Sequence, residues 1–207
     1  MEEELIHKIE VKKYEQIVHK KYKSYKWLMY LSLFGLSLMF LSLTFLYFVS
    51  HLNAQQPDLI IAPVFYWNTI ILLSSSSAVI IAQHHYRHDN FSEYKTSLLV
   101  WLGLGVLFLV GQICGWLVLF GSGFKFAHHS ASYLYVISGI HAVHIIGALA
   151  FLIIFINKSW TTLKDYATSV VYFTDPVAQS QLKLFGIFWH FLGVLWLYLL
   201  FFFLCVG

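Results

Sequence analysis

Five long apolar runs dominate this 207-residue chain and limit what it can fold into. A helix needs about 20 mainly apolar residues to cross the hydrocarbon core of a bilayer. Runs of that kind occupy residues 27–50, 62–83, 96–120, 132–157 and 182–206, and all ten acidic residues lie outside them. Only 11% of the residues are charged, whereas a soluble domain carries about 25%. The sequence therefore predicts an all-α, polytopic membrane protein with five transmembrane helices.

The lysine and arginine residues predict how these helices are oriented. The side of the membrane that receives the N-terminus holds 12 of the 13 Lys and Arg residues, and the other side holds only Lys125. Because cytoplasmic flanks carry the excess of positive charge, we expect a cytoplasmic N-terminus and a periplasmic C-terminus. The net charge of +3 is concentrated in one flank, which gives no reason to expect a nucleic-acid partner.

The most positive flank is the segment 1–26, which we expect to be cytoplasmic and to precede a five-helix membrane domain at 27–207. Within it, residues 5–18 place five apolar side chains on one rough helical face, with lysines elsewhere. This pattern favours an amphipathic helix lying on the membrane surface and a partly ordered, solvated tail about equally.

Three histidines, His141, His144 and His190, lie inside the fourth and fifth runs. Ionisable side chains at membrane depth are functional-site hypotheses by default. The first two are spaced i, i+3 and so share one helical face. We expect Gly147 and Ala148 to extend that face toward the cytoplasmic end.

Glycines accompany the histidines. Gly186 and Gly193 lie on one stripe with His190, and Gly111 and Gly115 form a GxxxG pattern in the third run. Small residues let neighbouring helices approach closely. We therefore expect helix packing at these four glycines, with the histidines set into grooves between helices rather than pointing at lipid tails.

Three chemical roles for the histidines remain open from the residues alone. They could ligate a metal ion, or two of them could clamp a haem b in an electron carrier. They could also relay protons, although the spans offer no Asp or Glu in series with them. Neutral rings bonded to backbone carbonyls, hydroxyls or lipid phosphates are the interpretation that the residues favour. A transporter is less favoured, because no inverted repeat is visible.

A basic cluster formed by His84, His85 and Arg87 ends the second run. Such a cluster at the cytoplasmic interface attracts anionic headgroups. Ordinary positive flanking of a span explains it equally well.

Four motifs, in order across the spans, resemble subunit III of the haem-copper oxidases. They are Asn68-Thr69 with Ser74–Ser77 and Gln83-His84-His85; Gly105, Phe108 and Gln112 before Trp116; Gly139, His141, His144 and Gly147; and Trp189-His190-Phe191 with Trp196. The chain is similar over 27–207 to the short, five-helix bacterial form, which lacks the first two of seven helices.

The resemblance implies a non-catalytic structural subunit of a proton-pumping cytochrome c or quinol oxidase in the bacterial inner (cell) membrane. Its partners would be the catalytic subunit I, which carries the haems and copper, and the other subunits of the complex. The chain itself would hold no metal or haem. In this family the helices form two bundles around a V-shaped cleft that holds phospholipid. An accessory protein of a nitric oxide reductase system is the related alternative.

The resemblance also implies which residues serve lipid binding or packing, namely His141, His144, Gly147, Trp189 and His190. Family members commonly carry three acidic residues at membrane depth. The corresponding positions here are Gly35-Leu36, Gly115 and Gly193. The resemblance therefore favours a structural and lipid-holding role over proton handling by carboxylates.

Overall fold

The chain folds into five long helices. The computed structural model describes residues 2–53, 62–122, 129–162, 173 and 176–206, and contains no strand among them. The helices are α1 (Glu2–Asn53), α2 (Val64–Arg87), α3 (Phe91–Gly121), α4 (His129–Thr162) and α6 (Pro176–Val206). Each is long and apolar enough to cross a membrane. This confirms the prediction of an all-α, multi-pass membrane protein.

The helices run beyond several of the expected spans. The second ends at Arg87 rather than at 83, and the fifth begins at Pro176 rather than at 182. Apolar residues mark only the part of a helix that lies in hydrocarbon. The extra turns contain polar residues, such as His84, His85 and Arg87 in α2 and Gln179, Ser180 and Gln181 in α6, as expected where a transmembrane helix leaves the hydrocarbon core.

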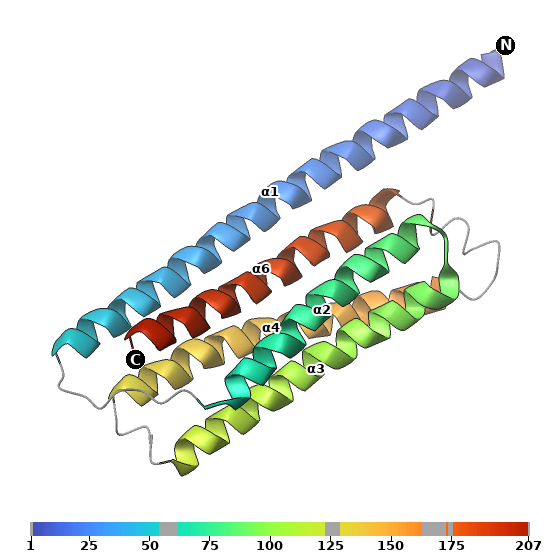
Figure 1. Ribbon diagram of the computed structural model, residues 1–207. Coiled ribbons are helices and arrows are strands. Elements are labelled where there is room, and N and C mark those ends of the chain that lie inside the picture. The colour runs from blue at the N-terminus through green and yellow to red at the C-terminus, as the bar shows by residue number, and fades with distance from the viewer. Residues whose placement is uncertain (1, 54–61, 123–128, 163–172, 174–175, 207) are drawn as a thin grey trace.

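The helices pack side by side in one bundle (Figure 1). The last helix, α6, contacts α1, α2 and α4, while α3 packs on α2 and α4. Only residues 88–90 separate α2 from α3, so these helices form an antiparallel hairpin. Within that turn Asp89 has a φ of 54°, a left-handed conformation that Asp tolerates better than most residues.

α1 is a single straight helix that extends well past the rest of the bundle at its N-terminal end (Figure 1). No glycine or proline precedes Gly35 in the sequence, so nothing breaks or kinks the helix before the span. The segment 5–18 is therefore helical and collinear with the span. A helix lying along the membrane surface would need a bend before the span, and α1 has none, so that expected placement is wrong. Most of the side chains of 5–18 lie outside the described residues, so the amphipathic pattern stays a prediction.

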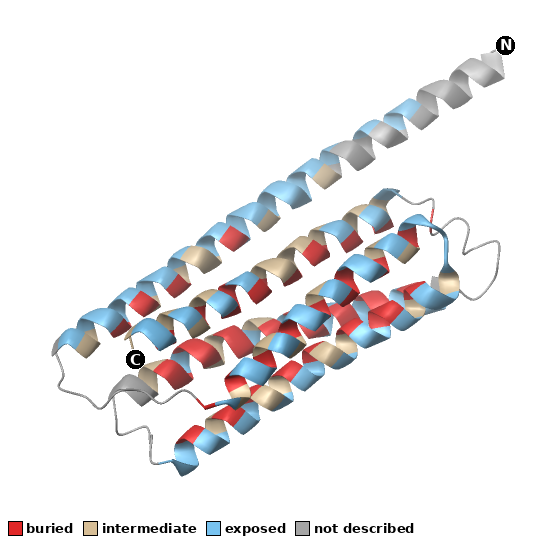
Figure 2. Cartoon of the chain, viewed as in Figure 1, coloured by how far each residue is buried: buried red, intermediate tan, exposed pale blue. Residues whose placement is uncertain are grey.

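Buried residues line the inner face of each helix, and exposed residues cover the outside (Figure 2). The exposed set includes many large apolar side chains, such as Leu31, Phe45, Leu117 and Phe201. In water such a surface would be unstable, but in a membrane it faces lipid tails. The two termini lie at opposite ends of the bundle (Figure 1). Which end faces the cytoplasm stays a prediction.

Candidate functional site

His141 lies at the centre of the bundle, inside a cage of aromatic rings. Its side chain is fully buried, and its ring is stacked on Trp196 with the centroids 5.6 Å apart. Phe40 and Phe108 present their edges at 6.2 and 6.1 Å. The cage combines one ring each from α1, α3 and α6.

Neither ring nitrogen of His141 has a hydrogen-bond partner among the described residues. Asn68 Oδ1 and Gln112 Nε2 also lack one within that part of the chain. Buried polar atoms are normally satisfied by protein groups or ordered water. His141 departs from this rule within the described residues, where its contacts are ring contacts with Phe40, Phe108 and Trp196.

His144 lies at the margin of the same interior. It is half-buried, and its Nδ1 atom lies 2.7 Å from the carbonyl oxygen of Ile140, one turn earlier in its own helix. This short contact fits an Nδ1–H that donates to the carbonyl. The ring also meets the edge of Phe40 at 6.0 Å.

Gly147 does not extend the histidine face, which corrects the sequence-based expectation. It is exposed, and no neighbouring atom lies within 4 Å of where its Cβ would be. Successive residues turn by about 100° around a helix axis. Gly147 therefore points roughly 120° away from His141, whereas Ala148 returns to within about 20° of it and is buried.

His190 is half-buried on α6, while its neighbour Trp189 is fully buried. Within the described residues, which include all three membrane-depth histidines, no group of three His, Cys, Asp or Glu side chains is placed to hold a metal ion. The structure therefore does not bring these histidines together as one ligand set.

Two tryptophans of α6 are hydrogen-bonded to hydroxyls of α2. Trp189 Nε1 donates to Ser75 Oγ, and Trp196 Nε1 donates to Thr69 Oγ1, both at 3.0 Å. The two tryptophans are seven residues apart and so lie on one face, two turns from each other. These bonds fix the register of α6 against α2.

Three of the four glycines that were expected to mediate packing lie at tight helix contacts. A Cβ on Gly115 would lie 2.7 Å from the ring of Phe65, and a Cβ on Gly111 would meet the amide of Asn68. A Cβ on Gly186 would likewise meet the amide of Gln83, whereas at Gly193 the nearest atom is Ser76 Oγ at 3.6 Å. The first three positions therefore admit no side chain without local rearrangement.

Residues of all four sequence motifs contact one another in this interior. Asn68 Nδ2 donates to Gln112 Oε1 at 3.4 Å, which joins the first motif to the second. The second motif meets the third where Phe108 packs on His141, and the third meets the fourth where His141 stacks on Trp196. We call this set, together with Thr69, Ser75, Gly105 and Trp189, the motif core.

Sequence reasoning missed two groups at the edge of the motif core. Phe40 carries no signal that separates it from other aromatics of its span. Ser138 accepts a 3.0 Å hydrogen bond from Trp116 Nε1 and so joins α4 to α3. Its position beside the motif glycine Gly139 is the one sequence clue to that role.

An apolar groove of about 620 Å³ lies between α3 and α4 on the outside of the bundle. Its lining residues are Leu109, Gln112, Ile113, Trp116, Tyr135, Val136, Gly139, Ile140, Ala142, Val143 and Ile146. The absent side chain of Gly139 keeps the groove open, with Trp116 4.0 Å from where its Cβ would be. None of the three membrane-depth histidines lines it.

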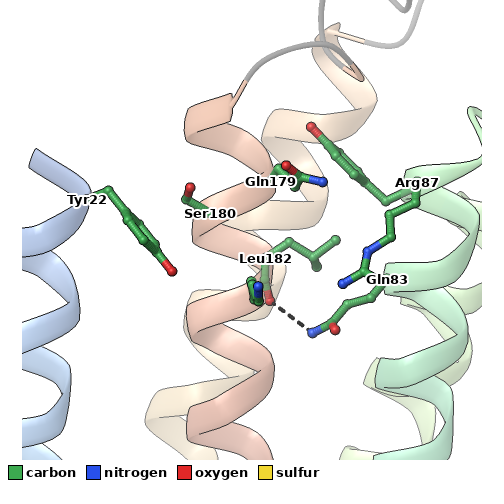
Figure 3. A pocket seen from close by; sticks show the side chains of 8 residues that line it. Tyr22, Gln83, Arg87, Gln179, Ser180 and Leu182 are labelled. Atoms are coloured by element: carbon green, nitrogen blue, oxygen red, sulfur yellow. Dashed lines mark hydrogen bonds between the residues drawn. The ribbon is translucent and has the colours of Figure 1, made fainter. Parts of the chain in front are cut away.

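The basic cluster at the end of α2 is divided by the helix geometry. His84 is exposed, and its ring packs 4.1 Å from that of His88. His85 is half-buried. Arg87 alone lines a separate polar hollow, between α1, α2 and α6 (Figure 3).

Comparison with known proteins adds no named relative: no family model matches the chain, and no curated protein matches it either. Any functional inference for this chain therefore depends on its motif residues and on how they are arranged.

The hydrogen bond between Trp189 and Ser75 is expected to stabilise the fold measurably. Hydrogen bonds between membrane helices contribute about 0.6 kcal/mol on average and about 1.7 at most. A double-mutant cycle of Trp189→Phe and Ser75→Ala, followed by unfolding in detergent, should give a coupling energy in that range. Trp67→Phe is the matched control, because Trp67 is 68% exposed. A coupling of zero would mean that the bond does not fix the register.

Proposed function

We propose that this chain is a non-catalytic structural subunit of a bacterial haem-copper terminal oxidase, similar to the short form of subunit III. Its main support is the mutual contact of the motif residues across α2, α3, α4 and α6. Residues that merely resembled a motif by chance would have no reason to converge in one core. In this role the chain stabilises the catalytic subunit of an aerobic respiratory complex.

The environment of His141 supports a structural role over an electron-carrying one. A haem needs axial ligands that face an open space large enough for the macrocycle. Here the ring of His141 is enclosed by Phe40, Phe108 and Trp196. The motif histidine therefore acts as a packing element between four helices.

The groove between α3 and α4 is where we place bound phospholipid. Its walls are mainly aliphatic and aromatic, which suits an acyl chain. In this proposal the N-terminus is cytoplasmic and the protein lies in the bacterial inner membrane, as the distribution of positive charge favours.

Co-purification tests the proposal directly. A tagged chain, isolated in mild detergent from the bacterium that encodes it, should bring down a haem-copper catalytic subunit with its haem spectrum. An untagged strain is the control for non-specific capture. The chain expressed alone should show no Soret band.

Other outcomes would point elsewhere. Capture of a nitric oxide reductase instead of an oxidase would assign the chain to that system. A Soret band in the isolated chain that disappears in His141→Leu would make it a haem carrier and contradict the proposal.

A further inference from the structure

A polar hollow of about 300 Å³ opens at one end of the bundle, between α1, α2 and α6 (Figure 3). Its lining residues are Tyr22, Gln83, Tyr86, Arg87, Gln179, Ser180, Leu182 and Lys183. This volume lies at the small end of the range for ligand pockets, about 300–1,000 Å³.

Two cations line the hollow without a carboxylate among the lining residues. Arg87 comes from the last turn of α2, and Lys183 comes from the second turn of α6. Arg87 extends from α2 toward α6 (Figure 3). An arginine fork can hold two oxygens of a phosphate, and a lysine adds a second positive charge. The hollow is therefore suited to an anion.

The remaining polar groups divide into those that can donate to an anion and those that cannot. Ser180 Oγ donates to the carbonyl oxygen of Pro176 at 2.7 Å, which occupies its only hydrogen. Gln83 Nε2 donates to the carbonyl oxygen of Leu182 at 3.5 Å. The hydroxyls of Tyr22 and Tyr86 and the amide of Gln179 complete the polar lining. The hollow thus offers neutral donor groups beside its two cations, among them the second hydrogen of Gln83 Nε2.

The position of the hollow places it at the level of lipid headgroups. It lies where α2 ends, where α6 begins and where the spanning part of α1 begins at Tyr22. The N-terminal end of α6, with the positive end of its dipole, lies on the same side. The sequence also predicts this side to be the more positive one, since the flanks assigned to it contain 12 of the 13 Lys and Arg residues.

We propose that this hollow binds the phosphate of an anionic phospholipid. The aromatic rings of Tyr22 and Tyr86 and the side chain of Leu182 give it an apolar wall beside its cations, which suits a glycerol backbone. A free phosphate ion would not need that wall. The site is separate from the groove between α3 and α4, and it does not depend on the proposed partner.

Lipid retention tests the site. The full-length protein is purified in detergent with added phosphatidylglycerol, and the lipid bound per chain is measured by native mass spectrometry. Removal of both cations in Arg87→Gln/Lys183→Gln should weaken binding at least tenfold, since each charge-assisted contact accounts for about a tenfold change. Arg87→Lys keeps the charge but loses the fork, so its affinity should be intermediate. Lys23→Gln is the control for Lys183→Gln, because each removes one positive charge and Lys23 lies on α1 outside the hollow.

Two further arms identify the source of the phosphate. Phosphatidylcholine should bind at least tenfold more weakly than phosphatidylglycerol. Inorganic phosphate at the same concentration should not displace bound phosphatidylglycerol. If it does displace the lipid, the site takes the free ion and the lipid assignment is wrong.

The proposal is also overturned if Lys23→Gln lowers lipid binding as much as Lys183→Gln, because surface charge alone would then explain the binding. Full retention by the double variant would overturn it as well. If the double variant fails to fold, the single variants Arg87→Lys and Lys183→Gln carry the test with the same readout.

Discussion

A leucine at Gly105 is expected to lower the melting temperature of the purified protein by about 10 °C. A Cβ at this position would lie 2.6 Å from Leu149 Cδ2 and 2.9 Å from Trp189 Cη2. Trp189 cannot simply move aside, because it is fully buried and bonded to Ser75. Overpacking of this kind costs about 1–3 kcal/mol, and more where the surroundings are rigid.

Gly103 offers a matched control on the same helix. No neighbouring atom lies within 4 Å of where its Cβ would be, and the position is exposed. Gly103→Leu should therefore leave the melting temperature unchanged or raise it slightly. Gly105→Ala should fall between wild type and Gly105→Leu. Equal melting temperatures for the two leucine variants would contradict the close contact of α3 with α4 and α6.

The second large effect is expected at His141. His141→Ala removes a buried ring from the aromatic cage and leaves a cavity, which should lower the free energy of unfolding by about 3 kcal/mol. His141→Leu refills most of that space and should cost about 1 kcal/mol, mainly the lost stacking on Trp196. Unfolding in a denaturing detergent, monitored by tryptophan fluorescence, measures both losses.

His144→Ala is the control for this pair, because His144 is half-buried and bonds within its own helix. It should cost less than His141→Ala. If His141→Leu proves as damaging as His141→Ala, the ring nitrogens have a role that packing does not explain.

The five spans could be predicted from the sequence because apolar length is a property of each segment alone. Close packing at Gly111 and Gly115 could also be predicted from the sequence, since a GxxxG pattern lies on one helical face whatever the partner helix is. The expectation for Gly147 was wrong, whereas the one for Ala148 holds, because Gly147 lies two steps of three residues beyond His141. Each such step falls about 60° short of a full turn, so two steps leave the face.

The pairing of the helices could not be predicted. Phe40 reaches His141 from a helix about a hundred positions earlier, and no local pattern indicates that contact. Arg87 was grouped with His84 and His85 because they are adjacent in sequence. The fold groups it instead with Tyr22 and Lys183, which come from two other helices. Side chains meet across helices according to helix rotation and register, and neither is encoded in any single segment.

The N-terminal part of α1 extends beyond the rest of the bundle as a continuation of the same helix. The helix continues unbroken for 52 residues, of which Tyr22–Leu52 form the membrane-spanning part. At about 1.5 Å per residue, the turns before Tyr22 extend roughly 30 Å along the axis of the same rod. A molecule bound to those turns would be joined to the membrane-spanning part by one continuous helix. A tilt imposed there would move Phe40 and, through its ring contact, would disturb the packing of His141.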